Sequence, residues 1–130
     1  LEGLKKTLET LRAVHDNTGV QQRMKTGKPA DPPVSHPVVI RHPESGRKIL
    51  YVSPSYTTHF EGWTEAESRP LLQYLYQHAQ QPEFFCRFRY EKGSIAFWDN
   101  YQTWHFAVND YEAGERLMHR IVVNGPPFER

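Results

Sequence analysis

Apolar residues recur at helical spacing at the start of the chain. Leu4, Leu8, Leu11 and Val14 follow one another at intervals of three and four, which places them on one face of a helix. The pattern therefore predicts that the chain opens with a helix through these residues. From Asn17 to Pro37 the composition shifts to Gly, Lys, Gln and Pro, which favours a loop.

Short apolar runs bounded by turn residues predict strands further along. Two hairpins are predicted, one formed by Val38–Ile40 and Lys48–Val52 and the other by Phe84–Tyr90 and Ser94–Trp98. A last strand is predicted over Met118–Asn124. Pro and Gly in the first connection and Gly in the second are typical of hairpin turns. The chain should therefore contain about five strands.

A second helix is predicted between the hairpins. Thr64 and Glu67 have the spacing of a capping box, and Leu71, Leu72 and Leu75 follow on one helical face. Pro70 is compatible with this helix only in its first turns, because proline lacks an N–H donor.

Composition narrows the class of protein. The 130 residues suffice for about one domain. Sixteen basic and fifteen acidic residues give a net charge of +1, which argues against a nucleic-acid or membrane surface built on bulk charge. The single cysteine, Cys86, suits a reducing compartment, and no signal-peptide pattern or bilayer-length apolar run occurs. We therefore expect a cytoplasmic protein with small partners.

The main candidate for chemistry is the segment that leads to His105. Imidazole is a common metal ligand, and Trp98 and Trp104 could shield a site beside it. Asp99 and Asn100 could fix the loop through hydrogen bonds from side chain to backbone. Arg116 and Arg120 follow eleven and fifteen residues after His105.

The even spacing of the two arginines places them on one face of a strand, where guanidinium groups match carboxylate or sulfonate anions. Salt bridges to Asp110 or Glu112 are an equally good explanation of the pair.

Two other pairs have the His-x-acid spacing of iron sites, His42-Pro43-Glu44 and His59-Phe60-Glu61. The first falls in a turn and the second where a strand ends, so we interpret both as coincidental. No phosphate-binding glycine loop, nucleophile elbow or paired-cysteine spacing occurs.

An ordered series of short motifs runs through nearly the whole chain. It comprises His36-Pro37-Val38-Val39, His42-Pro43-Glu44-Ser45-Gly46-Arg47, Tyr51-Val52, Thr57-Thr58, Glu67-Ser68, Leu71-Leu72, Trp98-Asp99-Asn100, His105, Asp110-Tyr111, Arg116 and Met118-His119-Arg120. In this order the motifs resemble the C-terminal part of the taurine and alkylsulfonate or alkylsulfate dioxygenases, which depend on iron(II) and 2-oxoglutarate. The resemblance implies a mainly β fold with helices, namely the C-terminal part of a double-stranded β-helix, or jelly roll.

The same resemblance implies roles for four residues. His105 resembles one of three Fe(II) ligands, and Arg116 the residue that binds 2-oxoglutarate. Arg120 resembles the residue that faces the sulfonate or sulfate of a small organosulfur substrate, and Tyr56 an aromatic residue against that substrate. The implied reaction uses O2, hydroxylates the substrate so that it falls apart with release of sulfite or sulfate, and forms succinate and CO2.

One part of the family pattern is missing. The family's first two iron ligands form a His-x-Asp pair upstream of the region that matches Leu1, and this sequence contains no His-x-Asp. We therefore expect residues 1–130 to be the C-terminal portion of a single dioxygenase domain, inactive alone, with exposed strand edges that favour a homo-oligomer. The alternative is a degenerate, non-catalytic β-domain that binds an anion or a partner chain. A hydrolytic zinc protein is disfavoured, because further ligands and a general base are lacking.

Overall fold

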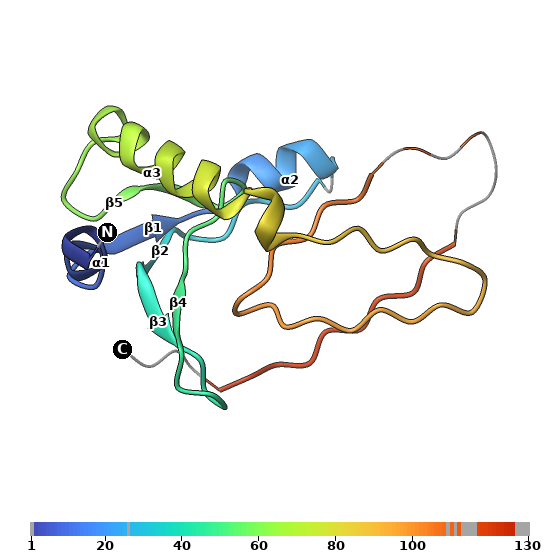
Figure 1. Cartoon of the computed structure of the whole chain (residues 1–130). Coiled ribbons are helices and arrows are strands. Elements are labelled where there is room, and N and C mark those ends of the chain that lie inside the picture. Colours follow the sequence, from blue (N-terminus) through green and yellow to red (C-terminus); the bar gives the residue numbers. More distant parts are fainter. Residues whose placement is uncertain (1, 26, 109, 111, 113–116, 127–130) are drawn as a thin grey trace.

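Figure 1 shows a computed structural model that describes residues 2–25, 27–108, 110, 112 and 117–126. The elements are α1 (Glu2–Leu8), β1 (Arg12–His15), α2 (Thr18–Met24), β2 (Val34–Pro37), β3 (Val39–Arg41), β4 (Lys48–Leu50), β5 (Thr57–Phe60), α3 (Glu65–Ala79) and the 3-10 helix η1 (Pro82–Phe84). Sheets accompanied by helices were expected from the sequence. No closed barrel forms within these described ranges, so the jelly roll stays a prediction.

The larger sheet has three antiparallel strands in the order β2-β1-β5. Ala13 at its centre is fully buried and lies opposite His36 on β2 and Phe60 on β5. The predicted opening helix is therefore wrong beyond Leu8. Two neighbouring strands hydrogen-bond to residues 12–15, and this long-range pairing overrides the local helical spacing.

The predicted loop between Asn17 and Pro37 is also only partly correct, because it contains α2 and β2. Asp16 helps to start α2, since its Oδ1 accepts a hydrogen bond from the Thr18 N–H at 2.8 Å. Lys25 ends the helix in the left-handed conformation, with φ of 49°. These are capping interactions that a composition argument does not register.

The first predicted hairpin is confirmed as β3 and β4. Ile40 lies opposite Ile49 in an antiparallel register, and Gly46 takes a φ of 65° in the turn, where glycine has no steric penalty. Fully buried Val38 lies between β2 and β3, so the chain passes from the three-stranded sheet into the hairpin at this residue.

The predicted helix after the hairpin is confirmed as α3, with Thr64 as its N-cap and a complete capping box to Glu67. Pro70 lies inside the helix. Figure 1 shows α3 lying along β5, and this packing forms the core. The buried core residues are Leu8, Ala13, Val38, Val52, Phe60, Leu72 and Leu75.

Beyond η1 the described residues form no helix and no paired strand, although turns occur at 92–93 and 100–102. The predicted hairpin over residues 84–98 and the last strand over 118–124 are wrong for the described residues, none of which is assigned to a strand there. The predicted turn does form, since Ser94 N–H donates to the Glu91 carbonyl at 2.9 Å and Gly93 has a φ of 87°. No second layer formed by the described residues covers those that flank the turn, and isolated pairs of strands are marginal in water.

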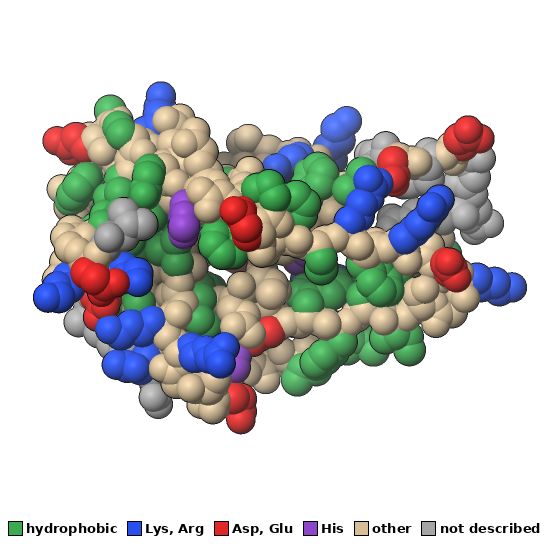
Figure 2. Space-filling view, viewed as in Figure 1, with side chains coloured by type: hydrophobic (Ala, Val, Ile, Leu, Met, Phe, Trp, Pro, Cys, Tyr) green, Lys and Arg blue, Asp and Glu red, His purple; other side chains and the backbone are tan. Residues whose placement is uncertain are grey.

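Many large apolar side chains among the described residues of 85–126, which we call the extended segment, are exposed. Phe97 is 97% exposed and Ile121 91%, and Figure 2 shows hydrophobic side chains along the surface of this part of the molecule. None of the helices in the described ranges is long and apolar enough to cross a bilayer.

Candidate functional site

The loop from Trp98 to His105 is fixed by hydrogen bonds that Asp99 accepts. Asp99 Oδ1 accepts from the Tyr101 N–H at 2.7 Å, and the Asp99 carbonyl accepts from the Thr103 N–H at 3.1 Å. Thr103 Oγ1 donates to the same carbonyl. The expectation that Asp99 fixes this loop is therefore confirmed, and the local pattern is the one that favours Asp in turns. Asn100 was expected to do the same, but its Oδ1 instead accepts from the Trp98 indole N–H at 3.1 Å, a bond between side chains.

The imidazole of His105 lies at the end of this loop, beside an indole. The ring centroids of His105 and Trp98 are 4.9 Å apart with an interplanar angle of 47°. Trp104 instead contacts Tyr76 on α3, with centroids 5.9 Å apart. His105 is exposed, and its ring makes no hydrogen bond within the described part of the chain.

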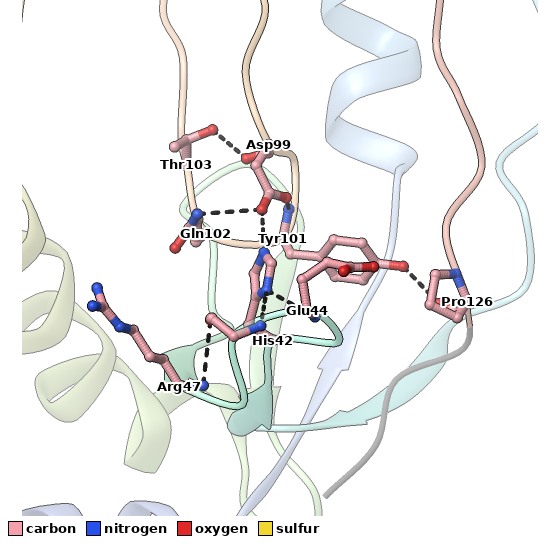
Figure 3. A network of polar contacts seen from close by, with 9 residues as sticks. His42, Glu44, Arg47, Asp99, Tyr101, Gln102, Thr103 and Pro126 are labelled. Carbon is pink, nitrogen blue, oxygen red and sulfur yellow. Dashed lines mark hydrogen bonds and ion pairs between the residues drawn. The ribbon is translucent and has the colours of Figure 1, made fainter.

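A second histidine holds the loop from the side. His42, in the turn between β3 and β4, lies with Nε2 2.5 Å from Asp99 Oδ2, and the two side chains are 12% and 30% exposed (Figure 3). The backbone N–H groups of Glu44 and Ser45 donate to His42 Nδ1, each at 3.2 Å. Because Nδ1 accepts, the ring proton is assigned to Nε2, which donates to Asp99.

The hydrogen bonds at Asp99 alter its acidity. Desolvation of the carboxyl acts to raise the pKa of Asp99, but the hydrogen bonds from the Tyr101 N–H, His42 and Gln102 outweigh it and lower the pKa below its usual value. Asp99 is therefore held as a carboxylate that accepts hydrogen bonds from several directions.

Tyr101 connects the same loop to the C-terminal end of the described chain. Its hydroxyl donates to the Pro126 carbonyl at 2.6 Å, and its ring lies edge-on to His42 with centroids 6.2 Å apart (Figure 3). Three segments far apart in sequence therefore meet at this point: the β3–β4 turn, the Trp98–His105 loop and Pro126.

Of the two predicted anion-binding arginines, the structure describes only Arg120, and it does not join this residue to His105. Arg120 is exposed in the extended segment, and Arg116 lies outside the described residues. Tyr56, which is 45% exposed, immediately precedes β5, and no contact within the described ranges links it to His105 or Arg120. The roles of these residues stay predictions.

Salt bridges from the two arginines to Asp110 or Glu112 were the alternative explanation of the pair. Asp110 forms an ion pair with Arg87, so its observed partner is neither of the arginines suggested by spacing. Glu61 of the second His-x-acid pair forms an ion pair with Arg12 at 3.1 Å. His42 of the first pair contacts Asp99, as described above.

Sequence reasoning missed a half-buried aromatic cluster of His15, His36 and Tyr51. The ring centroids lie 5.4 to 5.7 Å apart. Burial, with the neighbouring His36 as a second cause, lowers the pKa of His15 to about 4. Its Nε2 is buried without a hydrogen-bond partner. Only the register of β1 on β2, which the sequence does not reveal, brings the two histidines together.

The described residues supply one ligand that suits an iron site, and do not complete the site. An accessible imidazole such as that of His105 fits one position of a two-His-one-carboxylate triad. The described ranges contain no group of three or more His, Cys, Asp or Glu side chains that could hold a metal ion. A shallow pocket of about 320 Å³ lies between β5 and α3, and its lining includes Thr58, Arg69 and Tyr76 but neither His105 nor Arg120.

Comparison with known proteins defines the class. Residues 1–122 match the model of the taurine catabolism dioxygenase TauD, TfdA family, and the chain belongs to that family.

Individual relatives agree with this assignment. The chain is 40% identical over 119 residues to the alpha-ketoglutarate-dependent dioxygenase cnsP of Penicillium expansum, a match that covers 86% of this chain and 32% of the relative. It is 37% identical over 90 residues to an alpha-ketoglutarate-dependent sulfate ester dioxygenase of Pseudomonas putida, covering 69% of this chain and 30% of the relative.

A solved structure is similar as well. The crystal structure of a taurine dioxygenase from Burkholderia xenovorans superposes with a TM-score of 0.67 at 40% identity, covering 78% of this chain and 33% of that one. The chain thus spans about a third of the length of these relatives.

Proposed function

We propose that this chain is the C-terminal portion of an Fe(II)- and 2-oxoglutarate-dependent dioxygenase domain whose substrate is a sulfonate or sulfate ester such as taurine. When bound, the iron supplies oxygen activation coupled to decarboxylation of 2-oxoglutarate. The substrate would be hydroxylated at the carbon next to the sulfur-bearing group and would then lose sulfite or sulfate, which leaves that carbon as an aldehyde. Succinate and CO2 would form from 2-oxoglutarate.

The family match over residues 1–122 carries the proposal, because it includes His105, Arg116 and Arg120 in one continuous stretch. The accessible imidazole of His105, held beside Trp98, supports a ligand role for this residue. The names of relatives that act on sulfate esters and taurine support an organosulfur substrate.

The two arginines would act by positioning. A guanidinium binds a carboxylate or sulfonate through two parallel hydrogen bonds. Arg116 would orient 2-oxoglutarate, and Arg120 would hold the substrate anion so that one carbon faces the metal, which lowers the barrier by fixing the reacting geometry. Tyr56 would contact the apolar part of the substrate.

The exposed apolar side chains of the extended segment support an incomplete domain. Ile95, Phe97, Ile121 and Val123 are each at least 82% exposed, and a stable soluble domain buries most residues of this kind. The relatives are about three times as long as the matched region. Their additional chain is the natural cover for these residues, and it is where the family's other two iron ligands would lie.

Anaerobic titration of the full-length protein with Fe(II) and 2-oxoglutarate tests the proposal directly. We expect a weak visible charge-transfer band for the full-length protein and none for the 130-residue chain. Added taurine and an alkyl sulfate, with oxygen, should release sulfite or sulfate in proportion to succinate. If the full-length protein gives no band and no succinate, the non-catalytic β-domain becomes the better interpretation.

Substitution of the arginines in the full-length protein separates their roles. Arg116→Ala should weaken 2-oxoglutarate binding, and Arg120→Ala should weaken binding of the organosulfur substrate. A charged hydrogen-bonding partner contributes about 1.5–3 kcal/mol, so each loss should be about tenfold or more. Dissociation constants for both ligands in both variants measure the effect, with Arg87→Ala as the control. Equal losses of both ligands in both variants would contradict the division of roles.

A further inference from the structure

Both ring nitrogens of His42 are engaged in one specific arrangement. Nδ1 accepts from two backbone N–H groups of its own turn, and Nε2 donates to the Asp99 carboxylate at 2.5 Å. A ring held from both sides has its orientation and its tautomer fixed. His42 and Asp99 are 57 positions apart in sequence, so the contact connects the rigid β3–β4 hairpin to the Trp98–His105 loop.

Asp99 in turn holds its neighbours on both sides in the loop. It directly follows Trp98, whose indole ring packs on His105, and its carboxylate and carbonyl together hold Tyr101 and Thr103. The loop also meets the packed part through Trp104, whose ring lies 5.9 Å from that of Tyr76 on α3, and through the ring of Tyr101 beside His42. The His42–Asp99 contact is the charged hydrogen bond that joins the loop to the β3–β4 hairpin, so we expect the position of His105 relative to the hairpin to depend on it.

We propose that His42 is a positioning residue, which acts through Asp99 to hold the Trp98–His105 loop and thereby the imidazole of His105 in the place from which it binds the metal. The inference rests on the proposed function for the identity of the metal. The spacing His42-Pro43-Glu44 resembles a ligand pair, and the structure assigns its histidine a supporting role instead.

Three variants isolate the contact. His42→Leu has similar size and no donor. His42→Gln places an amide N–H near the position of Nε2, so it should restore the donor to Asp99 while it loses the Nδ1 acceptor. Asp99→Asn keeps the Oδ1 acceptor for Tyr101 but presents an amide donor to the His42 Nε2–H. His78→Gln, on α3, is the control for loss of an imidazole elsewhere.

In the 130-residue chain the readout is independent of any metal. NMR should show the Nε2–H tautomer of His42 and a cross-relaxation contact between the rings of Trp98 and His105. We expect this contact to disappear in His42→Leu and to persist in His42→Gln and His78→Gln. Persistence of the contact in His42→Leu, with the chain still folded by circular dichroism, would overturn the proposal.

In the full-length protein the readout is the dissociation constant for Fe(II), measured anaerobically without turnover. His42→Leu should weaken binding about tenfold, as expected for groups that orient a metal ligand, and His42→Gln should stay within about threefold of the wild type. In the Asp99→Asn background His42→Leu should have little further effect. Additive losses would show that His42 does not act through Asp99. A wild-type protein without Fe(II) affinity would count against the proposed function, whereas the NMR result would still decide the role of His42 in the loop.

Discussion

Apolar side chains of the same kind are buried in one part of this protein and exposed in another. The described residues of 2–84 form the packed part, and those of 85–126 form the extended segment. Phe60, the last residue of β5, is fully buried in the core, and Phe97 is 97% exposed. The difference lies in the partners available, since β1 has a strand on each side and a helix packs on β5. The extended segment has no facing layer among the described residues. Side-chain composition alone therefore does not determine which part of a chain packs.

The largest effect is expected when the same substitution, Phe to Ala, is made in each of the two parts. In the 130-residue chain Phe60→Ala should lower the free energy of unfolding by about 3–5 kcal/mol, because it removes a buried aromatic ring and leaves a cavity. Phe97→Ala should change it by less than about 0.5 kcal/mol, as for an exposed position. Guanidinium unfolding followed by tryptophan fluorescence and circular dichroism measures both.

If Phe97→Ala is as costly as Phe60→Ala in this chain, the extended segment packs in solution and the contrast fails. In the full-length protein the expectation differs, because the additional chain would cover Phe97. There Phe97→Ala should also become destabilising, which would identify the missing partner of the extended segment.

A smaller effect is expected for two serines that each accept a backbone N–H. Ser68 on α3 is fully buried, accepts from the Phe60 N–H at 3.0 Å and donates to the Thr64 carbonyl at 2.9 Å. Ser94 accepts from the Glu91 N–H at 2.9 Å in the turn of the extended segment.

Ser68→Ala should cost about 1–3 kcal/mol, because the Phe60 N–H is then buried without an acceptor. Ser94→Ala should cost less than about 0.5 kcal/mol, because water replaces the lost acceptor near the surface. Equal costs from urea unfolding of the two variants would mean that burial is not what separates the two parts.

The sequence predicted the features that depend on neighbours along the chain. The capping box of Thr64 and Glu67, the β3–β4 hairpin with its Gly46 turn, and the Glu91–Gly93 turn all follow from short-range chemistry. The same reasoning failed at β1, because Leu11 and Val14 match a helical period while the pairing of Ala13 with distant strands decides the structure.

In the candidate site, too, the sequence predicted the short-range contact and missed the long-range one. Asp99 was expected to fix its own loop, and it does so through Tyr101, two residues away. His42 was interpreted only as half of a coincidental ligand pair, because its contact with Asp99 spans 57 positions. A sequence pattern contains no information on such a contact until the hairpin and the loop are placed in space.

The smallest effect expected is on the pH dependence of stability, and it concerns the packed part alone. The pKa of His15 is lowered to about 4 in the folded chain, by burial first and by His36 second. Burial and the nearby Arg12 also lower the pKa of His36. At pH values between the pKa of unfolded His15, near 6.5, and its pKa in the folded chain, the unfolded chain binds more protons than the folded chain. Stability is therefore lost as pH falls through this range.

Because His15 is only partly shielded from solvent, we expect a loss of less than about 1 kcal/mol between neutral pH and about pH 5.5. His15→Gln should flatten this part of the profile, whereas His78→Gln should leave it unchanged. Urea unfolding at a series of pH values measures the difference between the variants, so that carboxylates common to all of them cancel. A slope that survives in His15→Gln would place the responsible group elsewhere, with His36 next to be substituted. If the free energy of unfolding of the wild type does not change over this pH range, His15 is hydrated in solution. The His15–His36–Tyr51 cluster would then be less shielded from water than the core of the packed part.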